Sequence, residues 1–104
     1  MTTSVPLLDA MELKDGEART VQVNGRGFAV FKIDGQFYVT DDECPHVGAS
    51  LGSGFVEEGQ VACAFHGWTF DIKTGNCLTC PDRPVRTYPA RVADGKVYAE
   101  VEDL

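Results

Sequence analysis

Three of the four Asn-Gly or Asp-Gly pairs in this 104-residue chain lie between short hydrophobic runs. These three pairs are Asn24-Gly25, Asp34-Gly35 and Asp94-Gly95, and each lies between runs rich in Val, Phe, Tyr and Ile. Such a pair is the strongest short-range signal for a tight β-hairpin, because the turn requires positive φ at both central residues. The sequence therefore predicts a mostly β fold.

The residues between these turns predict where the strands lie. Pro6 is compatible only with an edge strand or the start of a strand, so the run at 5–8 is expected at a sheet edge. The piece at 10–15 can form at most a short turn of helix, because Gly16 ends it. In the run at 96–101, alternate residues Val97, Ala99 and Val101 lie on one face of the expected strand. Further strands are expected at 20–23, 27–33, 36–40, 55–56, 60–64, 68–72, 85–92 and 96–101, with a flexible break at 52–54.

Composition limits the domain count and the class of partner. A chain of 104 residues with 43% hydrophobic positions can build one core, so a single domain is expected. The net charge of −7 and the absence of a Lys/Arg run argue against binding to nucleic acid or an anionic membrane. A basic protein partner would fit this charge, although acidity also serves solubility alone.

Targeting signals are missing from the sequence. The first six residues lack the basic and apolar regions of a secretory signal, and no apolar run approaches membrane-spanning length. Four cysteines in a chain of this kind favour metal binding or free thiols over a disulfide framework. A cytoplasmic protein is therefore expected.

Two Cys/His pairs carry the chemistry: Cys44-Pro45-His46, and Cys63 with His66 three positions later. Thiols and imidazoles are the soft and borderline ligands that suit iron and zinc, and the chain has no other histidine. Ligands at i and i+2 of an extended loop are up to about 7 Å apart, which suits two neighbouring irons better than one small ion. A single zinc ion would more naturally take Cys-x2-Cys and His-x3-His pairs. A zinc site, or buried thiols beside hydrogen-bonded histidines, remains the alternative.

The two segments Cys44-Pro45-His46-Val47-Gly48 and Cys63-Ala64-Phe65-His66-Gly67-Trp68-Thr69-Phe70 resemble the signature of the Rieske [2Fe-2S] family. The likeness covers the whole chain. It implies an all-β fold, an antiparallel β-sandwich or open barrel, as a single domain at 1–104. A small cluster-binding β subdomain would be inserted at about 42–84. It also implies one [2Fe-2S] cluster, with Cys44 and Cys63 on one iron and His46 and His66 on the other.

The chain departs from the high-potential respiratory members of that family. Their two extra cysteines, which bridge the ligand loops, correspond to Ala49 and Phe65. The Ser and Tyr that donate hydrogen bonds to sulfur in those relatives correspond to Trp68 and Phe70, which carry no hydroxyl. Fewer hydrogen bonds to sulfur predict a potential toward the low end of the family range, about −150 mV rather than +300 mV.

Other residues near the motif have two readings each. Cys77-Leu78-Thr79-Cys80 is not followed by a predicted helix, so these cysteines are expected to be non-ligand thiols, with a disulfide or adventitious metal as alternatives. Trp68 and Phe70 would form an apolar floor under the cluster or pack in the core. The segment 81–84 corresponds to a loop that covers the cluster in related proteins, or is a plain surface loop.

The resemblance implies a soluble one-electron carrier without catalysis of its own, since both histidines are already ligands and no flavin or nucleotide motif is present. The ferredoxins that serve ring-hydroxylating dioxygenases are the closest likeness. Such a protein takes electrons from a flavoprotein reductase and delivers them to a terminal oxygenase. The alternatives are the small subunit of an assimilatory NAD(P)H nitrite reductase, which would bind the reductase large subunit, and a structural zinc module.

Overall fold

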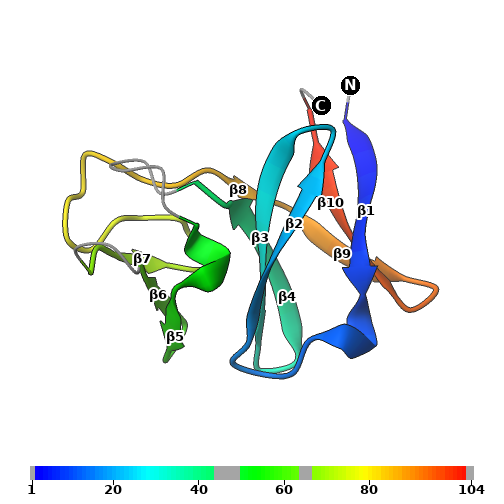
Figure 1. Cartoon of the computed structure of the whole chain (residues 1–104), viewed down its shortest axis with the longest axis horizontal. Helices are drawn as coiled ribbons and strands as arrows, with labels where there is room; N and C mark the ends of the chain where they lie inside the picture. The colour runs from blue at the N-terminus through cyan, green and yellow to red at the C-terminus, as the bar shows by residue number, and fades with distance from the viewer. Residues whose placement is uncertain (1, 44–49, 64–66, 103–104) are drawn as a thin grey trace.

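The computed structural model describes residues 2–43, 50–63 and 67–102 (Figure 1). These residues form three antiparallel β-sheets and two short 3-10 helices, η1 (Ala10–Glu12) and η2 (Leu51–Ser53). The first sheet has the order β1-β10-β9, the second β2-β3-β4-β8 and the third β5-β6-β7. The predicted all-β class is confirmed.

The strands follow the predicted turns closely. In chain order they are β1 (Thr3–Asp9), β2 (Ala18–Val23), β3 (Arg26–Ile33), β4 (Gln36–Asp41), β5 (Phe55–Glu57), β6 (Gln60–Ala62), β7 (Thr69–Asp71), β8 (Thr87–Tyr88), β9 (Ala90–Ala93) and β10 (Lys96–Val101).

The Asx-Gly pairs form the tight turns that the sequence predicts. Asn24, Asp34 and Asp94 have φ of 52°, 50° and 51°, and the glycine after each has φ between 75° and 80°. Positive φ at both central residues gives a turn whose twist matches that of paired strands. Glu58-Gly59 makes a fourth turn of this kind, with φ of 51° and 78°, between β5 and β6. Local backbone preference therefore accounts for three hairpins, and the fourth adopts the same turn with a glutamate at its first central position.

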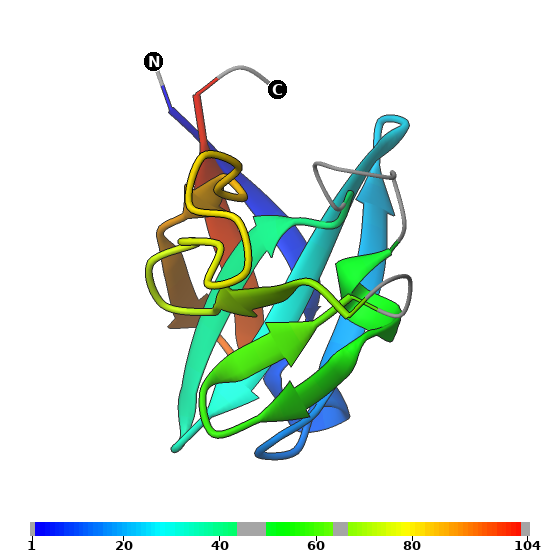
Figure 2. The same cartoon turned by 90° about the vertical axis from the view of Figure 1, so that its left-hand side faces the viewer.

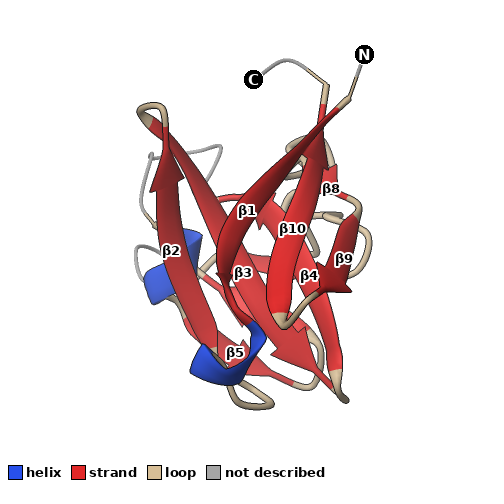
Figure 3. Cartoon of the chain, turned by 90° about the vertical axis from the view of Figure 1, so that its right-hand side faces the viewer, coloured by secondary structure: helices blue, strands red, loops and turns tan. Residues whose placement is uncertain are grey.

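One hydrophobic core lies between the first and second sheets, which pack face to face (Figure 3). The alternation expected in β10 is confirmed, since Val97, Ala99 and Val101 are fully buried. β1 is an edge strand that pairs only with β10, and its register shifts between Pro6 and Leu8. The pairing of β1 with β10 brings the two ends of the described chain together.

A second core lies between the β2-β3-β4-β8 sheet and the small β5-β6-β7 sheet (Figures 1 and 2). β3 is buried on both faces and serves both cores. Phe28 and Val30 point into the first core, and Ala29 and Phe31 into the second, each with no exposed surface. Figure 1 shows the small sheet beside the β2-β3-β4-β8 sheet, on the side away from β1. The subdomain at about 42–84 stays a prediction.

The prediction of one strand at 85–92 is wrong. The structure divides this run at Pro89 into β8, which pairs with β4, and β9, which pairs with β10. Proline has no N–H to continue a ladder, so strands end or change sheet at such a residue. The carbonyl of Pro89 accepts a hydrogen bond from the N–H of Glu100 (2.9 Å), and the chain crosses there from one sheet to the other.

The prediction of a flexible break at 52–54 is also wrong. These residues belong to η2 and the turn after it, and η2 packs against β2. A Cβ atom on Gly52 would lie 2.1 Å from Oγ1 of Thr20 and 2.8 Å from its backbone nitrogen. Glycine is required here by the close approach of two backbones rather than by flexibility.

The turn after β7 is held by hydrogen bonds to the side chain of Asp71. Oδ1 of Asp71 accepts hydrogen bonds from the N–H groups of Lys73 (2.9 Å) and Thr74 (3.3 Å), while Gly75 has φ of 80°. The N–H of Val85 donates to the carbonyl of Gly75 (2.8 Å).

Among the described residues, no helix has the length and apolar character needed to cross a bilayer.

Candidate metal centre

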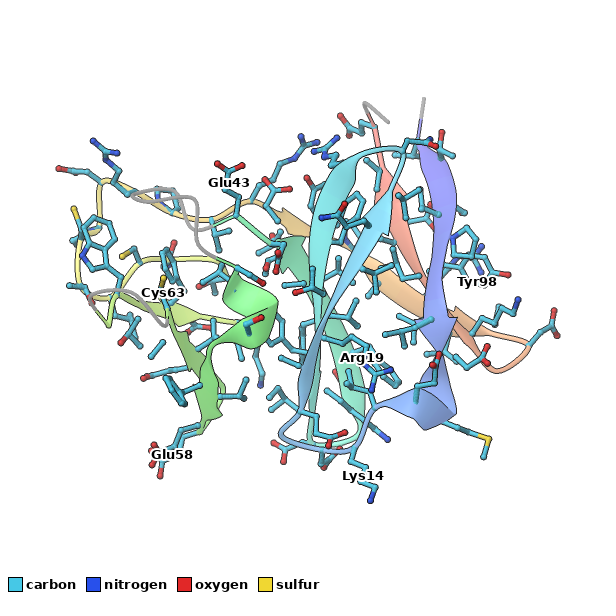
Figure 4. All side chains as sticks on the ribbon, in the orientation of Figure 1. Lys14, Arg19, Glu43, Glu58, Cys63 and Tyr98 are labelled. Carbon is cyan, nitrogen blue, oxygen red and sulfur yellow. The ribbon has the colours of Figure 1, made fainter. Side chains whose placement is uncertain are left out.

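The structure describes one of the four predicted ligands, Cys63. The other three, Cys44, His46 and His66, lie outside the described residues, in 44–49 and 64–66. Residues flanking both segments are described, and Leu51 and Cys63 belong to the same buried hydrophobic cluster. Figure 4 shows Glu43 and Cys63 on the same side of the β2-β3-β4-β8 sheet. The ligand assignment stays a prediction, and the flanking residues are what the structure adds.

The first ligand segment leaves the end of β4 and returns at η2. Glu43 and Ser50 form an isolated antiparallel bridge. One step further out, the N–H of Leu51 donates to the carbonyl of Asp42 (2.7 Å), and the N–H of Asp42 donates to the carbonyl of Gly27 (3.1 Å). The two ends of segment 44–49 are therefore held side by side and attached to β3.

The side chain of Asp42 ties this base to its surroundings. Its carboxylate is buried, with 9% of the residue exposed, and Oδ1 accepts three hydrogen bonds. The donors are the hydroxyl of Thr20 on β2 (3.0 Å), the hydroxyl of Ser50 (2.9 Å) and the N–H of Gly52 in η2 (2.8 Å). A single carboxylate thus connects both ends of the first ligand segment with β2.

The second ligand segment is the loop of the β6–β7 hairpin. Ala62 pairs with Thr69, and the N–H of Cys63 donates to the carbonyl of Trp68 (2.7 Å), which closes the base of the loop. Cys63 is 1% exposed. Its neighbours in the cluster include Phe70, fully buried, and Trp68, partly buried against it. The core-packing reading of Phe70 is therefore confirmed, while the floor under a cluster stays a prediction.

The segment after Cys77 lies against β7. Cys77 forms an isolated antiparallel β-bridge with Phe70. The N–H of Leu78 donates to the carbonyl of Thr69 (2.7 Å), and the N–H of Thr69 donates to the hydroxyl of Thr79 (3.0 Å). Residues 81–84 are exposed. Their role as a cover for the cluster stays a prediction.

A polar network holds the end of β4, and sequence reasoning missed it. The hydroxyl of Tyr88 donates to Asp41 and accepts from Arg26, and the Arg86 guanidinium lies 4.8 Å from the Tyr88 ring centroid. Burial, followed by the hydrogen bond to Asp41, raises the pKa of Tyr88 to about 12. Asp41 and Tyr88 are 47 positions apart, so no local pattern could have revealed the pair.

The described part of the site fits an iron–sulfur cluster. Cys63 presents a buried thiol from a hairpin whose base is closed by a backbone hydrogen bond. Its neighbours are apolar, which would limit the access of water to the sulfide of a cluster and to the Cys63 sulfur. The two thiols and two imidazoles predicted as ligands would supply the donor set of a mixed Cys/His cluster.

Comparisons with known proteins point to one family. The family model described as Rieske [2Fe-2S] domain matches residues 3–89. The 3-phenylpropionate/cinnamic acid dioxygenase ferredoxin subunit of Photorhabdus laumondii is 39% identical over 94 residues, covering 88% of this chain and 89% of that protein.

Solved structures give the same result. The Sphingomonas yanoikuyae B1 ferredoxin superposes with a TM-score of 0.88 at 34% identity, over 96% of this chain and 100% of that one. A chain in the complex of reduced oxygenase and oxidized ferredoxin in carbazole 1,9a-dioxygenase superposes with a TM-score of 0.87 at 31% identity, over 97% and 96% of the two chains. A putative NADH-dependent nitrite reductase small subunit from Mycobacterium tuberculosis superposes with a TM-score of 0.89, over 100% of this chain and 99% of that one. At 23% identity it shows likeness of fold alone.

Replacing Asp42 tests the clamp on the first ligand segment. Asp42→Ala leaves three donors without their acceptor, so we expect the free energy of unfolding to fall by about 2–4 kcal/mol. Asp42→Asn keeps an oxygen at the same position and should cost about 1 kcal/mol. Urea unfolding followed by far-ultraviolet circular dichroism measures both. The control is Asp82→Ala, an exposed carboxylate with an expected change below about 0.5 kcal/mol. Equal effects of Asp42→Ala and Asp82→Ala would contradict the clamp.

The raised pKa of Tyr88 predicts a loss of stability in strong alkali. The folded protein holds the phenol proton more tightly than the unfolded chain, whose tyrosine pKa is about 10. This contribution is therefore fully present below about pH 10 and is lost as the pH rises toward 12. In a spectrophotometric titration of tyrosinate, Tyr88→Phe should remove a step centred near 12. Removal of a step near 10 instead would show that Tyr88 is not buried against Asp41.

Proposed function

The chain belongs to the Rieske [2Fe-2S] domain family, and we propose that it is the ferredoxin of a dioxygenase system, a one-electron carrier. The observation that carries this proposal is that a dioxygenase ferredoxin subunit matches nearly the whole chain, rather than a part of it. The chain holds one Rieske-type [2Fe-2S] cluster, which when bound accepts and releases one electron at a time.

We assign the ligands residue by residue. Cys44 and Cys63 would hold one iron, and His46 and His66 the other. The burial of Cys63 and its place in a closed hairpin support its assignment. The antiparallel bridge of Glu43 with Ser50 supports that of the first segment, because both of its ends are held by the sheets. Ligands supported by such a rigid second layer keep their geometry when the charge of the site changes.

We propose a terminal oxygenase as the electron acceptor and a flavoprotein reductase as the donor. The likeness to a chain in an oxygenase–ferredoxin complex supports the first. The net charge of −7 supports docking to basic surfaces on both partners, with an association that weakens as salt rises. The same proposal includes a cytoplasmic location. It also includes a low reduction potential of the cluster, because Trp68 and Phe70 carry no hydroxyl that could donate to sulfur.

The ligand assignment predicts which substitutions remove the cluster. The purified protein is expected to contain iron and acid-labile sulfide in equal amounts, and His66→Ala or Cys63→Ala should lose both. The double variant Cys77→Ser, Cys80→Ser is the matched control, because it removes two thiols from the same side of the molecule and should keep the visible spectrum. Metal and sulfide analysis decides between the readings. A colourless protein with stoichiometric zinc would contradict the assignment.

The carrier role predicts transient complexes. Reconstitution with a flavoprotein reductase and a terminal oxygenase should give substrate oxidation that requires this protein and falls as ionic strength rises. An affinity pull-down from the native host identifies the partners. A stable stoichiometric complex with a large nitrite reductase subunit, surviving high salt, would replace the carrier by the fixed-subunit alternative.

A further inference from the structure

The sulfur of Cys77 lies beside the backbone of Cys80. The N–H of Cys80 donates a hydrogen bond to Sγ of Cys77, with 3.1 Å between nitrogen and sulfur. Standard bond geometry then places the Cα atom of Cys80 about 4 Å from that sulfur. The Cys80 sulfur is only two bonds from the same Cα atom. A separation of about 4 Å between this Cα atom and the Cys77 sulfur is compatible with the geometry of a disulfide.

The backbone between the two cysteines is fixed by neighbouring contacts. The chain bends at Leu78 and Thr79. Leu78 donates its N–H to the carbonyl of Thr69, and Thr79 accepts from the N–H of Thr69 through its hydroxyl. Because both intervening residues are attached to β7, the bend exists before any bond forms between the sulfurs. A disulfide here would require little movement of the backbone.

The two thiols differ in access to solvent. Cys77 is 2% exposed and belongs to the buried cluster that contains Cys63. Cys80 is partly exposed and packs against the same cluster. Among the described cysteines it is the one that a dissolved oxidant reaches first. The buried partner is held beside it, as a resolving thiol must be.

We propose that Cys77 and Cys80 form a reversible dithiol–disulfide site that is oxidised by hydroperoxides. The Cys80 sulfur attacks the terminal oxygen of the hydroperoxide and the O–O bond breaks. That oxygen stays on Cys80 as a sulfenic acid, and the other oxygen leaves as an alcohol, or as water when the oxidant is hydrogen peroxide. The Cys77 sulfur then attacks the Cys80 sulfur, the S–O bond breaks, and water leaves. Two thiols and one hydroperoxide give one disulfide, one alcohol and one water.

The position of the pair in the chain favours redox chemistry over structural stabilisation. Only two residues separate the cysteines, and a disulfide that closes so short a loop restricts the unfolded chain less than one that closes a long loop. Partly exposed disulfides are also the ones that small dithiols reduce most readily. The bond would form and break while the fold stays intact, and further oxidation of Cys80 would be prevented.

Peptide mass spectrometry of the peroxide-treated holoprotein tests the site. Trypsin releases residues 74–86 as one peptide, because Arg83 precedes proline, and this peptide contains Cys77 and Cys80 but no other cysteine. After treatment with hydrogen peroxide, we expect the peptide to have lost two hydrogen atoms and to resist alkylation. Dithiothreitol should restore full alkylation. The visible spectrum of each sample shows whether the protein remained folded around its cluster.

Two single variants assign the roles. Cys77→Ser lacks the resolving thiol, so its Cys80 is expected to collect two oxygen atoms as a sulfinic acid under the same treatment. Cys80→Ser retains only the buried thiol, which should still alkylate after unfolding. Sulfinic acid at Cys80 of the natural protein, at the level found in Cys77→Ser, would overturn the proposal. Full alkylation of the natural protein at the highest peroxide concentration that its spectrum survives would also overturn it.

Discussion

The double burial of β3 is the constraint on which the rest of the structure depends. Its residues alternate between two cores, with Phe28 and Val30 against the β1-β10-β9 sheet and Ala29 and Phe31 against the ligand-bearing side. A slip of one residue in its pairing would exchange the two faces and bury the wrong set. The strand therefore holds both halves of the molecule in one register.

Both ligand segments take their position from this strand. The first is attached through Gly27, at the start of β3, whose carbonyl accepts from Asp42. A Cβ atom at Gly27 would lie 3.2 Å from that of Asp42, so the two chains are already in close contact. The second is attached through the apolar cluster that joins Phe31 to Phe70 and Cys63. Hydrogen bonds of Asp42 thus hold the first ligand segment, which we call the polar flank of the site. Apolar packing against Phe31 holds the second, which we call the apolar flank.

The two flanks also differ in chemistry. Carboxylates and hydroxyls gather beside the first segment, where Asp42 and the pair of Asp41 with Tyr88 hold the end of β4. Sulfur gathers beside the second, where Cys63 and Cys77 share one cluster and Cys80 lies at its edge. Electron transfer and peroxide chemistry would then meet on the apolar flank. The residues of the polar flank hold the base of the first ligand segment.

The sequence by itself determined the hairpins and the ligand pattern. Positive φ at Asx-Gly pairs is a local preference, and Cys/His spacing is visible without a fold. Only the tertiary structure decided that Pro89 divides a strand between two sheets, that η2 packs tightly on β2, and that Asp42 collects three donors. Those donors come from residues 20, 50 and 52, which become neighbours only when the sheets assemble. Contacts between residues distant in sequence follow from packing, and packing leaves no local pattern to read.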